Sequence, residues 1–239
     1  RVSRVKTYVA DCGDAAVRVS VSGGTAEQNW NTVRSIAARF DLGADGIVSV
    51  IPTYDALLVE FDNLLTDHDA VRGLVREATT IPRPLEGEPR TFEIPVVYGG
   101  EHGPDLGDTA RFLGVTEAEV VRLHSAAPLV MRCYGSPGGA PMLDGPAFGL
   151  PIPRRSSPRP HVAAGSVAVA GRQAVVSARP APGGWAVIGR TPLILVDPAS
   201  EQISAYRPGD LFVFRAIDAD RWDDFDGRSL LPVGGDPHG

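Results

Sequence analysis

The chain has 239 residues, of which 43% are hydrophobic and 22% charged, a composition typical of globular proteins. Its net charge of −6 argues against non-specific nucleic-acid binding, and no run of about 18 apolar residues predicts a membrane span. The first ten residues lack the apolar segment of a secretory signal, and only two cysteines occur, Cys12 and Cys133. We therefore expect a cytoplasmic protein that binds neither nucleic acid nor membrane.

The first 80 residues alternate between strand and helix patterns. Strands are expected at 5–10, 15–21, 46–51 and 56–61. The capping box Thr25-Ala26-Glu27-Gln28 predicts the start of one helix, and Asp67 predicts the start of a second. These elements indicate an α+β sandwich, with an antiparallel sheet and two helices on one side.

Prolines at 82, 84 and 89 mark a linker, so we predict domains at 1–84 and 85–239. The second domain opens with a strand at 92–98 and two helices that begin near Pro104 and Thr116. From Gly135 to Pro192 the sequence has ten prolines and ten glycines, which favours short strands joined by tight turns in a β-barrel or sandwich. Strands are expected at 166–170, 173–178, 185–188, 193–196 and 211–217, followed by a loose acidic tail from about 218.

The segment from Tyr98 to Leu106 is the first candidate for chemistry. Glu101, His102 and Asp105 lie at or just before a predicted helix start, after a Gly99-Gly100 turn. We predict that they lie near His124 as a catalytic cluster in which a neighbouring carboxylate raises the pKa of His124. The alternatives are that Asp105 only favours the helix dipole and that His124 is a core histidine.

The second candidate is a basic region. No acidic residue occurs between Asp144 and Asp197, and a positive field of this kind suits a small anionic ligand. Prolines stiffen the loop at 153–161, which carries arginines, and this stiffness lowers the entropy lost on binding. The residues predicted to bind substrate or anion are Arg154, Arg159, Gln173 and Arg190. A solvated surface loop is the alternative.

Gly183 and Gly184 precede Trp185 at a predicted strand start, where glycines allow a ligand or another chain to approach closely. We assign these three residues to a pocket or a partner surface, with a core position for Trp185 as the alternative. No metal-ligand spacing, Walker A loop, dinucleotide fingerprint or nucleophile elbow is present, so no metal is expected.

Several motifs in order resemble one known family. They are Tyr-Gly-Gly-Glu-His-Gly-Pro-Asp-Leu at 98–106, Leu-His-Ser at 123–125, Pro-Arg-Arg-Ser-Ser-Pro-Arg at 153–159, Ala-Gly-Ser at 164–166, Pro-Gly-Gly-Trp at 182–185 and Ile-Gly-Arg-Thr-Pro at 188–192. Together, over about residues 5 to 217, they are similar to the B-type subunit of 5-oxoprolinase. The same family includes allophanate hydrolase subunit 1 and the histidine-kinase inhibitor KipI.

The resemblance implies a ferredoxin-like N-terminal domain and a cyclophilin-like β-barrel C-terminal domain. It also implies a larger partner, similar to the C-type subunit of 5-oxoprolinase or to allophanate hydrolase subunit 2, and a third subunit. The implied reaction is the ATP-dependent opening of the 5-oxoproline lactam to glutamate, with ATP and Mg²⁺ not bound by this chain alone. We expect a hydrolase subunit that is inactive by itself and acts on a small anionic metabolite.

The sequence also departs from the family. Where members usually carry aromatics, this chain has Ser136, Ala140 and Met142, and 173–178 differs from the usual Gln-Thr-Gly-Ile-Tyr-Pro. These changes leave three alternatives open: an allophanate hydrolase or urea-carboxylase-like carboxyltransferase subunit, a non-catalytic histidine-kinase inhibitor, and a silent paralogue that keeps only the partner interface.

Overall fold

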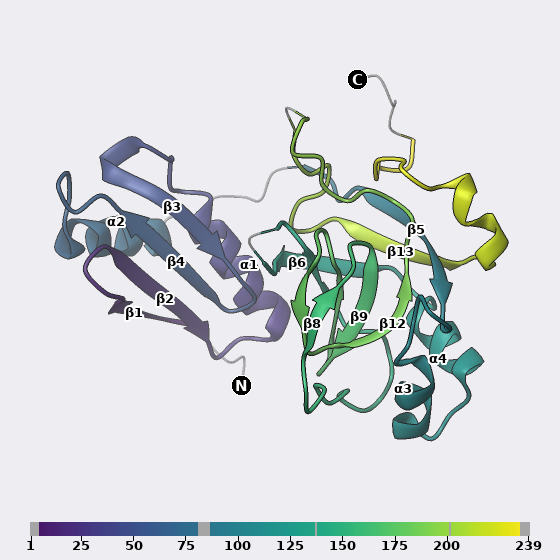
Figure 1. The fold of residues 1–239 in the computed structure, drawn as a ribbon. Helices are drawn as coiled ribbons and strands as arrows, with labels where there is room; N and C mark the ends of the chain where they lie inside the picture. The colour runs from purple at the N-terminus through teal and green to yellow at the C-terminus, as the bar shows by residue number, and fades with distance from the viewer. Residues whose placement is uncertain (1–4, 81–86, 137, 201, 235–239) are drawn as a thin grey trace. The chain divides into compact units, whose positions relative to one another are not determined.

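The computed structural model describes residues 5–80, 87–136, 138–200 and 202–234. The chain divides into two compact units, residues 1–88 and 89–239, which we describe separately (Figure 1). The predicted boundary between residues 84 and 85 lies outside the described residues. Within the described residues, no helix is both long enough and apolar enough to cross a membrane.

The first unit is an α+β sandwich, as predicted. Its elements are β1 (Lys6–Asp11), β2 (Ala16–Ser22), α1 (Ala26–Ala37), η1 (Ala44–Gly46), β3 (Ile47–Pro52), β4 (Ala56–Phe61) and α2 (His68–Thr80). The strands form an antiparallel sheet in the order β1-β2-β4-β3. The element order ββαββα differs from the βαββαβ order of a ferredoxin-like domain, so that assignment stays a prediction.

Local sequence explains where α1 begins. The Thr25 side chain accepts a hydrogen bond from the Gln28 N–H at 3.2 Å, and the Gln28 side chain accepts one from the Thr25 N–H at 2.9 Å. This confirms the predicted capping box. Trp30, Val33 and Ile36 bury one face of the helix in the unit's core.

The second unit is built around a closed β-barrel. Its elements are β5 (Thr91–Tyr98), α3 (Leu106–Leu113), α4 (Glu117–His124), β6 (Leu129–Tyr134), β7 (Pro141–Asp144), β8 (Arg159–Val162), β9 (Ser166–Ala170), β10 (Gln173–Val176), β11 (Ala181–Gly183), β12 (Ala186–Arg190), β13 (Leu211–Ala216) and η2 (Ala219–Asp224). The barrel order is β10-β7-β6-β13-β5-β12-β9, and β8 pairs with β11 in a separate ribbon. Strands β5 and β13 run parallel and the other described neighbours run antiparallel. The barrel prediction is therefore confirmed.

Two expectations for this unit were wrong. Residues 193–196 form only isolated bridges, which join Ile194 to Ser229 and Val196 to Ser204. The tail is not loose between 218 and 234, because Leu230 is buried and its N–H donates to the Ile194 carbonyl at 2.9 Å. Apolar side chains spaced among the acidic residues hold this segment on the barrel, and residues 235–239 lie outside the described part.

Candidate functional site

The segment between β5 and α3 packs closely against β12. Gly99 and Gly100 adopt positive φ angles of 72° and 53°, which only glycine takes without strain. The Gly99 N–H donates to the Ile188 carbonyl at 3.1 Å, and a Cβ on Gly103 would lie 2.1 Å from that same oxygen. This approach, which requires glycine at 103, brings Asp105 to the side of β12.

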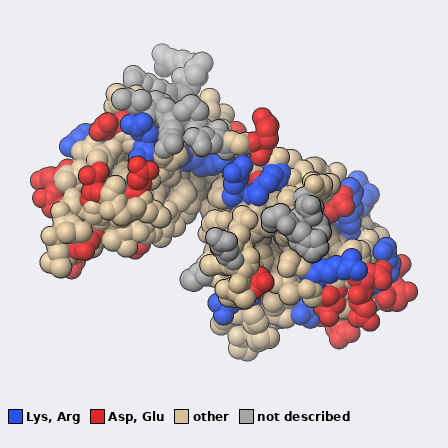
Figure 2. Space-filling view, turned by 90° about the horizontal axis from the view of Figure 1, so that it is seen from above, with Lys and Arg blue, Asp and Glu red and all other residues tan. Residues whose placement is uncertain are grey.

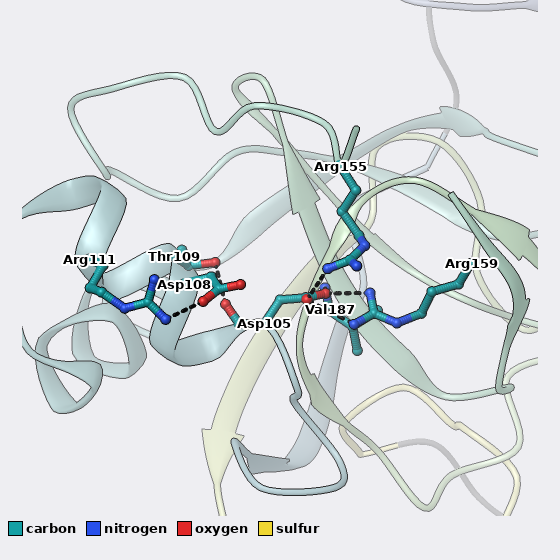
Figure 3. A network of polar contacts seen from close by, with 7 residues as sticks. All are labelled: Asp105, Asp108, Thr109, Arg111, Arg155, Arg159 and Val187. Atoms are coloured by element: carbon teal, nitrogen blue, oxygen red, sulfur yellow. Dashed lines mark hydrogen bonds and ion pairs between the residues drawn. The ribbon is translucent and has the colours of Figure 1, made fainter. Parts of the chain in front are cut away.

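Asp105 is the centre of a buried polar network (Figure 3). Its side chain accepts hydrogen bonds from Arg155 at 2.6 Å, from both terminal nitrogens of Arg159 at 2.6 and 2.8 Å, and from the Val187 N–H at 2.8 Å. The Asp105 N–H donates in turn to the Val187 carbonyl at 2.9 Å. We call these contacts the Asp105 clamp, and it joins the start of α3 and β12 to the two arginines.

The clamp keeps Asp105 ionised. Burial alone would raise the pKa of this carboxyl, but the hydrogen bonds from Arg159 and Val187 and the charges of both arginines lower it below its ordinary value. A carboxylate with a lowered pKa and all its acceptor sites engaged is a poor general acid or base. The geometry therefore supports a positioning role for Asp105 in place of the predicted catalytic one.

The clamp also fixes the loop that precedes β8. The Arg155 N–H donates to the Gly184 carbonyl at 2.8 Å, so the loop is tied to the segment before β12. The guanidinium carbon of the neighbouring Arg154 lies 5.7 Å from the centre of the Trp185 ring, within the range of a cation–π contact. Arg154 is thus held over Trp185, and the residue that follows it is anchored.

A hollow of about 260 Å³ opens beside Trp185, and we call it the Arg154 hollow. Its polar lining comes from Ser136, Arg154, Ser177 and Arg179. Its apolar lining includes Ala140, Met142, Val175, Ala178, Gly183, Trp185 and Val187. The structure thus gathers three predicted residues, Arg154, Gly183 and Trp185, around one space. The positions with missing aromatics, 136, 140 and 142, line the same space.

His124 lies in the barrel core. It is fully buried, its Nδ1 is 2.7 Å from the Tyr98 hydroxyl, and its ring centre is 4.4 Å from that of Phe214. Burial lowers its pKa to about 3, so the expectation of a raised pKa was wrong. Among the described contacts, none joins His124 to Glu101, His102 or Asp105, because the apolar face of α4 turns its histidine inward.

The other predicted residues lie in several places. Glu101 is exposed, whereas the His102 ring stacks on Trp222 of η2 with the ring centres 4.6 Å apart. The Arg190 guanidinium lies 5.2 Å from the centre of the same tryptophan ring, and its Nε donates to the Ala164 carbonyl at 2.9 Å. The two contacts with Trp222 hold η2 in place, and neither His102 nor Arg190 lines the hollow.

Gln173 begins β10, where it pairs with Asp144 and Ala170 in the sheet register, and it does not line the hollow. Gly184 contributes the carbonyl that accepts from Arg155. The residues that sequence reasoning did not select are Arg155, Arg179, Ser136 and Ser177. The arginines were visible as part of the acid-free stretch, and the two serines lie at positions where the sequence departs from the family, although no binding role was predicted for them.

The described residues contain no group of three or more His, Cys, Asp or Glu side chains that could hold a metal ion. Figure 2 shows basic and acidic side chains side by side on the face that it displays.

The sequence matches the family described as carboxyltransferase domain, subdomain C and D, over residues 7–206. Within that class it is 33% identical over 225 residues to the B-type subunit of 5-oxoprolinase from Bacillus subtilis (strain 168), covering 89% of this chain and 94% of that protein. It is also 39% identical over 187 residues to the corresponding 5-oxoprolinase subunit of Haemophilus influenzae, covering 78% and 85%. The chain therefore belongs to the carboxyltransferase family that contains the B-type subunit of 5-oxoprolinase, as the motifs predicted.

Solved structures agree on the fold. Protein PH0987 from Pyrococcus horikoshii is 30% identical, with a TM-score of 0.53 over 90% of this chain and 100% of that one. TTHA0988 is 28% identical, with a TM-score of 0.73 over 90% of this chain, which spans only 40% of that protein. The urea amidolyase of Kluyveromyces lactis, 14% identical, has a TM-score of 0.74 over 94% of this chain and 16% of its own, and so supports the fold alone.

Proposed function

We propose that this chain is the smaller subunit of an ATP-dependent 5-oxoprolinase-type complex, and that its partner is a larger subunit with a homologous barrel. The observation that carries the proposal is the 33% identity to the Bacillus subtilis protein, which extends over 94% of that subunit. Because the similarity extends over nearly the whole length of that subunit, it favours a shared role over the reuse of a single domain. The Arg154 hollow gives the chain a place for a small anionic metabolite, in keeping with this role.

The ATP and Mg²⁺ of the proposed complex are not expected to bind in the Arg154 hollow. The hollow of about 260 Å³ is below the roughly 300–1,000 Å³ of pockets for drug-sized ligands, and no acidic side chain is among the residues that line it. Mg²⁺ bound with nucleotide is held by carboxylates and phosphate oxygens. These residues do not fit a magnesium nucleotide, so no step through ATP is assigned to them.

The proposal also covers fold and location. The sandwich is proposed to be ferredoxin-like, with β1 in the place of the domain's last strand. This assignment is supported by the position of β1 beside β2 at the sheet edge. The barrel is proposed to be cyclophilin-like. A cytoplasmic location is proposed because Cys12 and Cys133 are both free thiols.

The test is reconstitution. The chain and a candidate larger subunit, with a third subunit where one is encoded nearby, are co-expressed, and ATP hydrolysis is measured with and without 5-oxoproline. We expect 5-oxoproline-dependent ATP hydrolysis by the assembled complex and none by this chain alone. A stable complex with no such activity would instead favour the silent paralogue, an alternative that the small side chains at Ser136, Ala140 and Met142 of the hollow suggest.

A further inference from the structure

The Arg154 hollow carries an uncompensated positive charge. Arg154 and Arg179 both line it, and neither forms an ion pair with a carboxylate among the described residues. None of the residues that line the hollow is Asp or Glu. Arg155 and Arg159, which are close in sequence, instead both pair with the single carboxylate of Asp105. The two arginines of the hollow are therefore available to an external anion.

The size and lining of the hollow limit that anion. A volume of about 260 Å³ suits a small metabolite, and much of the wall is apolar, with Trp185, Met142 and Val187 contributing. Ser136 and Ser177 add hydroxyl groups that can donate to or accept from polar atoms of a ligand. This combination fits a compact molecule that has one anionic end and a partly apolar body.

The surrounding backbone favours a carboxylate over a phosphate. Proteins commonly hold phosphate on the free N–H groups of a helix N-terminus. The hollow is lined by residues of strands and their connections, and none of its lining residues belongs to α3 or α4. An arginine fork can hold a carboxylate or a phosphate through parallel hydrogen bonds, so the preference for a carboxylate rests on the lack of a helix N-terminus in the lining.

Arg154 is also held in place before any ligand arrives. The Asp105 clamp and the Arg155–Gly184 hydrogen bond fix the residue that follows it, and Trp185 lies under its guanidinium. A side chain that is already ordered loses less entropy when it binds. We propose that the Arg154 hollow binds a small carboxylate, whose carboxylate group contacts Arg154 and Arg179 and whose ring packs beside Trp185.

The choice of a lactam ring as the ligand's body rests on the proposed function, whereas the carboxylate recognition does not. The test is isothermal titration calorimetry of the full chain with three probes. These are 5-oxoproline, 2-pyrrolidinone, which is the same ring without the carboxylate, and inorganic phosphate. We expect 5-oxoproline to bind at least about tenfold more tightly than either other probe, because charged hydrogen bonds are the main contribution.

Variants locate the binding. Arg154→Gln and Arg179→Gln should each weaken 5-oxoproline binding about tenfold or more. Arg172→Gln is the matched control, since Arg172 is an exposed arginine of the same unit that does not line the hollow. Both hollow arginines are exposed, so the variants should fold, which thermal melting of each variant verifies.

Four results would overturn the proposal: no binding of 5-oxoproline, equal binding of 2-pyrrolidinone, tighter binding of phosphate, or equal effects of all three substitutions. The outcome is separate from that of reconstitution. If the chain binds 5-oxoproline in the hollow but its complex stays inactive, this inference holds and the proposed function is wrong. If the complex is active but the isolated chain binds no carboxylate, the proposed function holds and this inference is wrong.

Discussion

Replacing Asp105 by Asn tests the clamp without changing the size of the side chain. Asp105 is only 2% exposed, and its oxygens accept hydrogen bonds from both arginines and from the Val187 N–H. An asparagine has a single acceptor oxygen, and its NH₂ group would face donors of the two guanidinium groups. The substitution therefore removes the charge and leaves arginine donors without an acceptor.

The expected cost follows from burial. Removing one partner of a fully buried ion pair costs about 3–5 kcal/mol. The Arg155 and Arg159 side chains are 34% and 25% exposed, so they regain part of their hydration, and we expect a loss near the lower end, about 3 kcal/mol. For a unit of this size that loss lowers the melting temperature by roughly 6–12 °C.

The assay is urea denaturation of the full chain, followed by a signal from the barrel unit. Asp108→Asn is the control, because Asp108 is 62% exposed and pairs with Arg111 on the surface of α3, where such a pair contributes less than about 1 kcal/mol (Figure 3). Equal stability of the two variants at pH 7 would refute the clamp. The pKa of Asp105 is lowered in the folded state, so its contribution to stability is present above the unfolded carboxyl pKa and is lost as pH falls through the folded pKa. The free energies of unfolding of the two variants should therefore become equal in acid.

Three further predictions concern the barrel unit. His124→Gln removes a histidine whose pKa is lowered to about 3, so the difference in free energy of unfolding between the wild type and this variant should shrink by about 2 kcal/mol between pH 7 and pH 5. A difference in urea midpoint that stays constant with pH contradicts the lowered pKa. Gly103→Ala should destabilise the unit more than Gly114→Ala in thermal melts. A Cβ at 103 meets backbone at 2.1 Å, whereas one at 114 meets nothing within 4 Å and adds only the strain of a positive φ of 69°, about 1–2 kcal/mol; similar losses would argue against the close approach. Leu230→Ala should lower the free energy of unfolding by about 2–4 kcal/mol, whereas Leu231→Ala should lower it by less than about 0.5 kcal/mol, because Leu231 is 41% exposed. A Leu230→Ala variant as stable as the wild type would support a loose tail instead.

Much of the fold was predictable because its signals are local. The capping box at Thr25 and the periodic apolar residues behind it define α1 through contacts within one or two turns. The density of turn residues after Gly135 predicted a β-barrel or a sandwich in the same way, and the choice of a barrel came from the resemblance to the family. The ribbon of β8 and β11 was not predicted, because prolines at 160 and 182 argue against a strand in the sequence. The ribbon forms only through pairing between these two distant segments.

The errors share a physical cause: in each case the outcome depends on packing between segments that are distant in sequence. The tail from 218 looked loose because it is rich in acidic residues, yet Trp222 and Leu230 find partners at His102 and at Ile194. His124 looked reactive because it was expected to lie beside the carboxylates of the 98–106 segment. Whether a histidine on an apolar helix face meets a carboxylate or a core depends on the strands that it packs against.

The candidate site shows the same limit in its charges. The acid-free stretch predicted a broad positive field, but Asp105 lies outside that stretch and engages the guanidinium groups of both Arg155 and Arg159. The arginines that line the hollow are Arg154 and Arg179. Holding the neighbouring arginines on Asp105 makes the site more selective, because their donors are then occupied and offer a carboxylate ligand no second place to bind. An acid that looked catalytic in sequence thus serves binding by deciding which arginines remain free.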